Sequence, residues 1–470
     1  MPTSTKLTAT RPELFRDLGV SHASAIVVGT IIGSGIFLVP AEMMQAVGSA
    51  RLVYLAWLVG GLLSFFGALT YAELGAMKPQ AGGEYVYVRD AYGPLGGFLY
   101  GWTWFVIAKP ASVATIATGL VRILGTFSIF SFFSRNVIST PFSVTYGQIV
   151  AISAAILISF LNYLGVKKAG EFQLVFTLLK VAIILGIVAI CFGGGENVTG
   201  HGWSNFAGTF SGAKGGIAGF MAALVAALWA YDGWNDLNMV AGEVKRPERN
   251  IPIALIAGVA TVGVLYVLVN AGVQYVLPAS VIAVSPRPAS DAVALVMGHM
   301  GAAIVSAGMA ISMLVTLNGT IMSGARVPYA MARDGYFFRA LAEVHPRFHT
   351  PLAAIVVQAV LSIVLLLLGG NFRQLFSLAI FAEWLFYMIA GSTIFVFRWR
   401  EPQAARPYRV IGYPFVPAIF IAVAAVLLFY TFRENWPNSF YGLLVILAGV
   451  PVFSWFRWRR TVNGTLTPLR

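Results

Sequence analysis

Two short polar stretches interrupt apolar segments of the chain. Residues 29–37 read GTIIGSGIF and residues 229–236 read WAYDGWND, so glycines, a serine and acids stand where a membrane helix would be continuous. Unwinding at such points frees backbone N–H and C=O groups. The amides at the start of a half-helix can hold a carboxylate, and freed carbonyls can accept hydrogen bonds from an ammonium. Together the stretches offer what a zwitterionic amino acid needs.

Three charged residues also stand inside apolar runs: Lys109 in VIAKPASVATIATG, Lys180 in FTLLKVAIIL and Glu383 in IFAEWLFY. Charges within a membrane helix are costly and are therefore functional candidates that face the protein interior. Lys180 could make fixed contacts or exchange a proton. Lys109 could contact substrate, pair with Glu383 or line a hydrated vestibule. Glu383 could couple transport to protons, pair with Lys109 or recognise a cationic substrate.

The composition places these residues in a membrane. The 470-residue chain is 58% hydrophobic and 10% charged, with a mean hydropathy of +0.80, whereas soluble domains contain about 25% charged residues. Backbone groups in lipid must bond one another, so long apolar stretches indicate helices. We expect an all-α polytopic membrane protein with twelve spans, at about 18–45, 52–76, 94–121, 143–165, 172–194, 216–241, 252–276, 293–325, 351–370, 375–397, 413–432 and 438–456.

The net charge of +13 reports topology rather than a nucleic-acid partner. With the N-terminus inside, most of the 31 Lys and Arg residues fall in segments expected to be cytoplasmic, as the positive-inside rule predicts. We expect a cytoplasmic tail over 1–17, one transmembrane domain over 18–460 and a second cytoplasmic tail over 461–470. Two polar segments, 82–93 and 334–348, mix aromatic and basic residues and are typical of interfacial helices.

The sequence predicts no metal site and no cofactor. The one cysteine, Cys191, has no partner for an intramolecular disulfide. His345 and His349 have helical spacing, but Pro346 and Pro351 would break the helix that the pairing needs.

The two interruptions gain meaning from their places in the order of spans. If the first ten spans form two five-helix repeats, spans 18–45 and 216–241 are equivalent positions. Paired interruptions at corresponding places point to the central site of a transporter. A GSG sequence alone favours close helix packing, and it is the coincidence of the two breaks that favours a binding site.

The chain resembles the amino acid–polyamine–organocation (APC) superfamily, in particular its L-type amino-acid transporter branch. Four stretches carry the resemblance: GTIIGSGIFLVP (29–40), YAELGAMKPQAGGEYVYVRDAYGP (71–94), WAYDGWNDLNMVAGEVKRPERNIPIAL (229–255) and ARVPYAMARDGYFF (325–338). The resemblance implies a LeuT-type five-plus-five inverted repeat with two extra helices. It also implies sodium-independent amino-acid transport at the cell membrane, often by obligatory exchange.

The resemblance assigns the substrate's charged ends to the first interruption. Backbone amides of Ser34, Gly35 and Ile36 would bind the carboxylate, and Gly33 would permit the unwinding. The carbonyl of Ile31 would receive the ammonium.

The second interruption would complete the pocket. The carbonyls of Trp229 and Asp232 would also receive the ammonium, and the Trp229 ring would close over the substrate. Ala230 and Gly233 would set the depth of the side-chain pocket. Lys180 would point at the unwound part of the first span, where sodium-coupled relatives hold an ion.

Further polar residues of the later spans and of the cytoplasmic side are also candidates. Asn318 and Thr320 either line the pocket or bond helix to helix. The arginine exchangers of the superfamily carry a glutamate at the position of Asn235, so their substrate pair is not expected here. The polar residues Glu73, Lys78, Arg326 and Arg333 are expected to stabilise one gate state on the cytoplasmic side.

Animal members that pair with a glycoprotein heavy chain use a cysteine in the loop between the third and fourth spans. Here that loop, 122–142, has none, so no disulfide-linked subunit is expected.

The leading hypothesis is an exchanger of neutral L-amino acids that works by alternating access. A proton-coupled symporter and an exchanger that accepts charged amino acids remain open. An intramembrane enzyme would need a nucleophile–base pair or metal ligands, and a channel would need selectivity rings. The sequence indicates neither.

Overall fold

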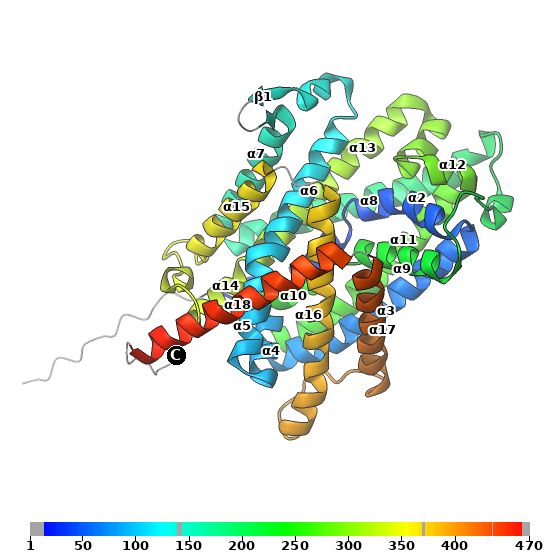
Figure 1. Ribbon diagram of the computed structural model, residues 1–470. Helices are drawn as coiled ribbons and strands as arrows, with labels where there is room; N and C mark the ends of the chain where they lie inside the picture. The colour runs from blue at the N-terminus through cyan, green and yellow to red at the C-terminus, as the bar shows by residue number, and fades with distance from the viewer. Residues whose placement is uncertain (1–13, 139–142, 369–371, 435, 463–470) are drawn as a thin grey trace, which may run out of the picture.

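The protein is a bundle of helices (Figure 1). A computed structural model describes residues 14–138, 143–368, 372–434 and 436–462. The α-helices are α1 (Val20–Ile31), α2 (Gly35–Val47), α3 (Ala50–Met77), α4 (Glu84–Tyr92), α5 (Pro94–Thr103), α6 (Lys109–Leu124), α7 (Tyr146–Tyr163), α8 (Val166–Gly194), α9 (Gly216–Ala230), α10 (Asp236–Met239), α11 (Pro247–Val276), α12 (Ala279–Val284), α13 (Pro288–Gly324), α14 (Arg326–Arg333), α15 (Leu352–Leu367), α16 (Phe372–Arg400), α17 (Phe415–Glu434) and α18 (Trp436–Val462).

Shorter elements connect these helices. Two strands, β1 (Asn136–Ile138) and β2 (Val144–Thr145), form a small antiparallel ribbon in which Asn136 faces Thr145. The 3-10 helices are η2 (Ser128–Ser134), η3 (Gly195–Asn197), η4 (Trp203–Ala207), η5 (Ala241–Glu243) and η6 (Arg339–Ala342), and η1 (Trp104–Ala108) is a π-helix.

The described residues contain nine helical segments that are long and apolar enough to cross a membrane, and α9 and α15 are shorter apolar helices. Each of the expected spans coincides with one helix or with consecutive helices. The span 375–397, for example, coincides with α16. Large apolar side chains such as Leu58, Leu178 and Val264 are exposed on the outside of the bundle. This confirms a polytopic helical membrane protein, while the inverted repeat and the sidedness of the tails stay predictions.

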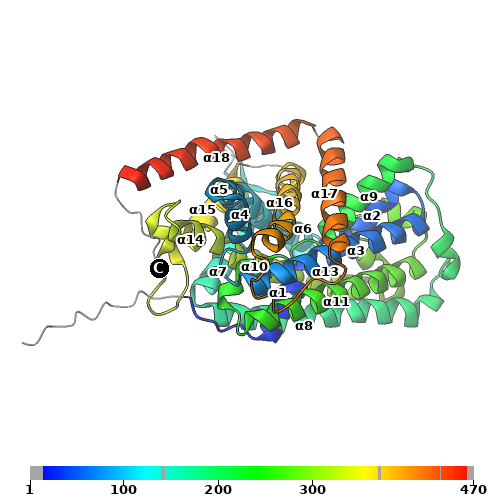
Figure 2. The same cartoon turned by 90° about the horizontal axis from the view of Figure 1, so that it is seen from below.

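The first and sixth expected spans are each broken in the middle. Helix α1 ends at Ile31 and α2 begins at Gly35, so residues 32–34 are not helical. Helix α9 ends at Ala230 and α10 begins at Asp236, with turns over 231–235. In Figure 2, α1 and α10 lie in the middle of the bundle, where α1 packs against α8, α11 and α13.

The two breaks touch each other, and glycines allow the approach. A Cβ atom added to Gly35 would lie 3.0 Å from Cα and Cβ of Ala230, and one added to Gly233 would lie 2.9 Å from Cγ2 of Thr30. Gly233 also has φ of +105°, a conformation that residues with a side chain rarely adopt. The glycines of both stretches therefore let two unwound backbones meet.

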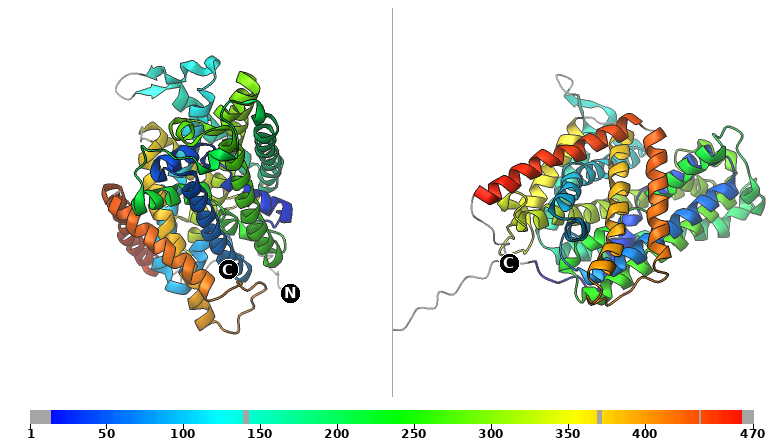
Figure 3. Two further views of the ribbon diagram at one scale, coloured as in Figure 1. Left: turned by 90° about the vertical axis from the view of Figure 1, so that its right-hand side faces the viewer. Right: turned by 60° about the horizontal axis from the view of Figure 1, so that its bottom comes forward.

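The last two helices lie on one flank of the bundle (Figures 2 and 3). Helix α17 packs against α16 and α3, and α18 packs against α5 and α16. Neither contributes a residue to the cavity described below.

The two predicted interfacial helices have different outcomes: a helix forms in the first segment, and the second prediction is wrong. Residues 84–92 form a helix, α4, as expected, and most of its side chains are buried; its place at a membrane interface stays a prediction. Over 334–348 only the short 3-10 helix η6 forms. Gly335, with φ of +77°, ends α14 there, and Pro346 offers no amide for a helical hydrogen bond.

A fully buried ion pair joins η5, which follows the broken sixth span, to α14. Arg326 Nε lies 2.8 Å from Glu243 Oε2, and Arg326 Nη2 lies 2.9 Å from Glu243 Oε1. Neither side chain has exposed surface. The amide of Leu18 donates to the Glu243 carbonyl at 2.9 Å, so the segment before α1 is attached at the same place. Glu73 pairs with Arg398, and Lys78 pairs with Asp90 and Glu401.

We expect Arg326→Met to destabilise the protein by about 3–5 kcal/mol, because it leaves Glu243 as a buried charge without its partner. Thermal unfolding in detergent measures the effect. The exposed Arg409, changed to Ala, is the matched control. Equal melting temperatures of the two variants would contradict the prediction, whereas Arg326→Met with Glu243→Met should recover part of the loss.

We expect Gly233→Ala to lower stability by about 1–3 kcal/mol, because alanine must adopt a positive φ there and its Cβ would meet Thr30. The control is Gly186→Ala within α8, where nothing lies within 4 Å of the added Cβ. That variant should melt at the wild-type temperature or slightly above. Equal melting temperatures of the two alanine variants would contradict the prediction, because they would show that the contact between the breaks does not require glycine at position 233.

Candidate functional site

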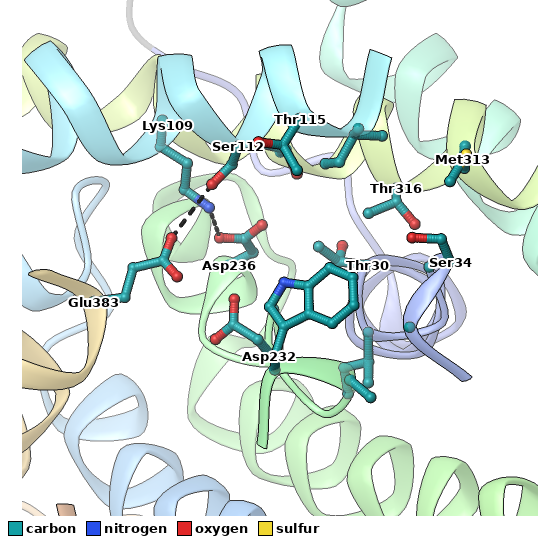
Figure 4. A pocket seen from close by; sticks show the side chains of 18 residues that line it. Thr30, Ser34, Lys109, Ser112, Thr115, Asp232, Asp236, Met313, Thr316 and Glu383 are labelled. Carbon is teal, nitrogen blue, oxygen red and sulfur yellow. Dashed lines mark hydrogen bonds and ion pairs between the residues drawn. The ribbon is translucent and has the colours of Figure 1, made fainter. Parts of the chain in front are cut away.

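The two helix breaks and the helices α6, α13 and α16 enclose a cavity (Figure 4). Both of the polar stretches that interrupt the apolar segments, 29–37 and 229–236, contribute residues to the wall of this cavity. The lining residues are Thr30, Ile31, Gly33, Ser34, Gly35, Lys109, Ser112, Thr115, Ile116, Trp229, Ala230, Asp232, Gly233, Asp236, Met313, Thr316, Thr320 and Glu383.

Most residues singled out in the sequence meet at this cavity. Of the nine residues expected to bind substrate, eight line it. The ninth, Ile36, is buried in the first turn of α2, where it can contribute its backbone amide. Of the residues expected to act in coupling, Lys109, Glu383 and Thr320 line the cavity, whereas Lys180 and Asn318 do not.

The start of α2, which no side chain caps, lies at the cavity. The first N–H groups of an α-helix have no acceptor within the helix, and no side chain caps α2. Ser34 and Gly35, at this end of α2, line the cavity. These N–H groups and the helix dipole favour a bound anion.

Tyr266 on α11 bridges the two breaks, and the sequence analysis did not single it out. Its hydroxyl lies 3.0 Å from the carbonyl oxygen of Ile31 and 2.8 Å from that of Ala230. The tyrosine is fully buried. The carbonyl of Ile31, expected to receive an ammonium, also accepts from the Gly33 amide at 2.8 Å, so it has room for an ammonium when the single hydroxyl proton of Tyr266 goes to Ala230 instead.

Lys180 on α8 binds the carbonyls that the first break leaves open. Its Nζ donates to the carbonyl oxygens of Gly29 and Ile32, each at 2.6 Å, and lies 3.2 Å from Thr316 Oγ1. Ser312 Oγ donates to Ile32 as well, at 2.9 Å. The lysine is buried, so its ammonium replaces the amides that would bond these carbonyls in a continuous helix.

Lys109 forms an ion pair with Asp236, the first residue of α10. The side chains are 6% and 0% exposed. Glu383, one of the partners considered for Lys109, instead lies with Oε1 3.4 Å from Ser112 Oγ. The sequence analysis missed Asp236, although it belongs to the same WAYDGWND stretch and lies four residues after Asp232.

The chain changes its helical pitch directly before Lys109. The π-helical segment η1 ends at Ala108, and α6 begins with Lys109 and Pro110. Proline has no N–H to continue the helical hydrogen bonds, and such π-helical turns occur often at functional sites.

A chain of polar side chains continues from the cavity towards α4. The Tyr387 hydroxyl lies 2.7 Å from Asp232 Oδ1 and 3.0 Å from Asn235 Oδ1. Asn235 Nδ2 donates to Glu84 Oε1 at 2.6 Å. Glu84 lies in α4, outside the spanning helices, and burial raises the pKa of its carboxyl to about 7. Residues far apart in the sequence thus form one network.

Asn318 and Thr320 on α13 have different roles, which the sequence left open. Thr320 lines the cavity. Asn318 is fully buried between helices, where its Nδ2 donates to Gln173 Oε1 at 2.7 Å and its Oδ1 accepts from Asn162 at 2.9 Å. Asn318 therefore bonds α13 to α7 and α8.

A second hollow adjoins the cavity, and the two share Ser34 and Met313. Arg122 and Arg287 lie in its wall, and both belong to loops or helix ends expected outside the cell. Among the residues described, no three His, Cys, Asp or Glu side chains are grouped so that they could hold a metal ion.

Comparison with known proteins agrees with this architecture. Residues 18–450 match the family model described as Amino acid permease. The serine/threonine exchanger SteT of Bacillus subtilis is 31% identical over 450 residues, which cover 95% of this chain and 98% of that protein. The human cystine/glutamate transporter is 30% identical over 97% of this chain and 89% of its own length.

A third relative, the human b(0,+)-type amino acid transporter 1, is 31% identical over 97% of this chain and 91% of its own length. Three findings agree: the family model matches nearly the whole chain, the relatives are 30–31% identical over almost their full length, and two helices are broken at the cavity. The chain belongs to the amino acid permease family of the APC superfamily and is an amino-acid transporter.

Proposed function

We propose that the protein is a sodium-independent exchanger of neutral L-amino acids in the cell membrane. One observation carries the proposal: the unwound segments of two helices meet at one cavity, which the uncapped start of α2 also lines. The relative named a serine/threonine exchanger supports exchange as the mode of transport.

In this proposal the amides of Ser34, Gly35 and Ile36 bind the substrate carboxylate. The ammonium is received by the carbonyls of Ile31, Trp229 and Asp232. Since both charged groups of the substrate are bound by the breaks, the side chain extends across Ala230 and Gly233 towards the part of the cavity near Lys109. Trp229 covers the bound substrate.

The position of Lys180 supports sodium independence. A sodium ion is bound by carbonyl and hydroxyl oxygens, and here the carbonyls of Gly29 and Ile32 and the hydroxyl of Thr316 already surround an ammonium. A second cation at that place would be repelled by the lysine.

Alternating access would proceed by movement of α1, α2, α3, α9, α10 and α11 against α5, α6, α7, α13 and α15. The hollow beside Ser34 supports a path from the expected outside. The buried Arg326–Glu243 pair supports closure on the opposite side. The protein would work without a disulfide-linked subunit, since its one cysteine, Cys191, is fully buried.

Proton-coupled symport is a second candidate, favoured by the acids at the cavity. Asp232, Asp236 and Glu383 line it together with one cation, Lys109. Three carboxylates beside one ammonium would leave negative charge in a buried site, which is unfavourable. The carboxylates therefore either bind protons or bind a cationic ligand.

Uptake of labelled amino acids by proteoliposomes in sodium-free buffer distinguishes the candidates. Uptake that requires unlabelled amino acid inside supports exchange, and the panel of substrates identifies the class. Uptake into empty vesicles that requires an inward proton gradient supports symport instead. A folded protein that takes up no amino acid under either condition contradicts the proposal.

We expect Lys180→Met to reduce initial uptake about tenfold or more, because the Gly29 and Ile32 carbonyls would lose the buried donor that fixes the break, at about 1–3 kcal/mol for each unsatisfied group. Lys168→Met, at an exposed position of the same helix, is the control. Both variants are compared in equal amounts of reconstituted protein. Wild-type rates in Lys180→Met would show that the ammonium does not hold the break in its active geometry.

A further inference from the structure

The cavity has two chemically different ends. In Figure 4, Ser34, Met313 and Thr316 lie at one end, and Lys109, Asp236 and Glu383 lie at the other. If the substrate's carboxylate binds at the amides near Ser34, its side chain points to the charged end. The side chains at that end therefore select among substrates. This inference rests on the proposed function.

The one cation at that end is already neutralised. Lys109 is paired with Asp236, and its Nζ lies 5.2 Å from the centre of the Trp104 ring. Glu383 lines the same part of the cavity and bonds Ser112, one turn after Lys109 on α6. The ammonium thus has an acid, an aromatic ring and a second acid around it.

An acidic substrate could use Lys109 only by displacing Asp236. Asp236 has no exposed side-chain surface, so it would be left as a buried carboxylate without a partner, which is strongly unfavourable. Glu383 and Asp232 would repel the incoming carboxylate as well. A neutral side chain meets neither obstacle.

We propose that Asp236, with Glu383 as a second acid, makes the pocket reject acidic side chains by masking Lys109. Without these two acids, Lys109 becomes a free cation at the side-chain end and the pocket accepts amino acids with a carboxylate side chain. Asp236 is then a specificity-determining residue, and the substrate class of the natural protein excludes glutamate and aspartate.

The test is the ratio of glutamate uptake to serine uptake in proteoliposomes, measured for the wild type, Asp236→Asn and the double variant Asp236→Asn with Glu383→Gln. The double variant is needed because Glu383 can approach Lys109 once Asp236 is neutral. We expect the ratio to rise in the single variant and by about tenfold or more in the double variant. Adding Lys109→Met should abolish the gain. Glu196→Gln, at an exposed position, removes one acid elsewhere and should leave the ratio unchanged.

An unchanged ratio in an active double variant overturns this inference alone. A wild type that takes up no amino acid overturns the proposed function as well. If the double variant binds but does not transport, the thermal shift with glutamate decides: stabilisation of the double variant but not of the wild type supports the masking of Lys109. If glutamate stabilises the double variant and the wild type equally, or stabilises neither protein, the masking of Lys109 is overturned.

Discussion

Backbone groups that are freed inside a membrane protein must find partners, and this constraint governs the centre of the structure. Breaking a helix between Ile31 and Gly35 leaves carbonyls and amides without their helical partners inside the bundle. Lys180 and Tyr266, both buried, satisfy carbonyls of the broken helices. No side chain caps the start of α2, and Ser34 and Gly35 there line the cavity, which is why we propose that the carboxylate of a substrate supplies the partner for these amides.

The charged side chains at the cavity obey the same constraint. Lys109 and Asp236 come from different helices and are tolerable in the interior because each neutralises the other. The polar chain from Asp232 through Tyr387 and Asn235 to Glu84 distributes the remaining acids over hydrogen-bonding partners. Charges thus persist at depth where the neighbouring helices supply complementary groups.

The names of the relatives show that one family includes transporters for different amino acids. At 30–31% identity over almost the full length, their names refer to serine and threonine in one case and to cystine and glutamate in another. A shared fold holds different substrates when a few side chains in the pocket differ. In this protein we propose that role for the residues at the end of the cavity opposite Ser34.

The sequence by itself determined the helical membrane architecture, the two breaks and most of the cavity wall. Apolar length, glycine placement and isolated charges are local signals, and each follows from the cost of exposing polar groups to lipid. Only the tertiary structure decided the partners. That Lys109 meets Asp236 rather than Glu383, that Tyr266 joins the two breaks and that Asn318 bonds helices depends on which faces of distant helices pack together. No spacing along the chain encodes such contacts, because they join residues that only the packed bundle brings within reach.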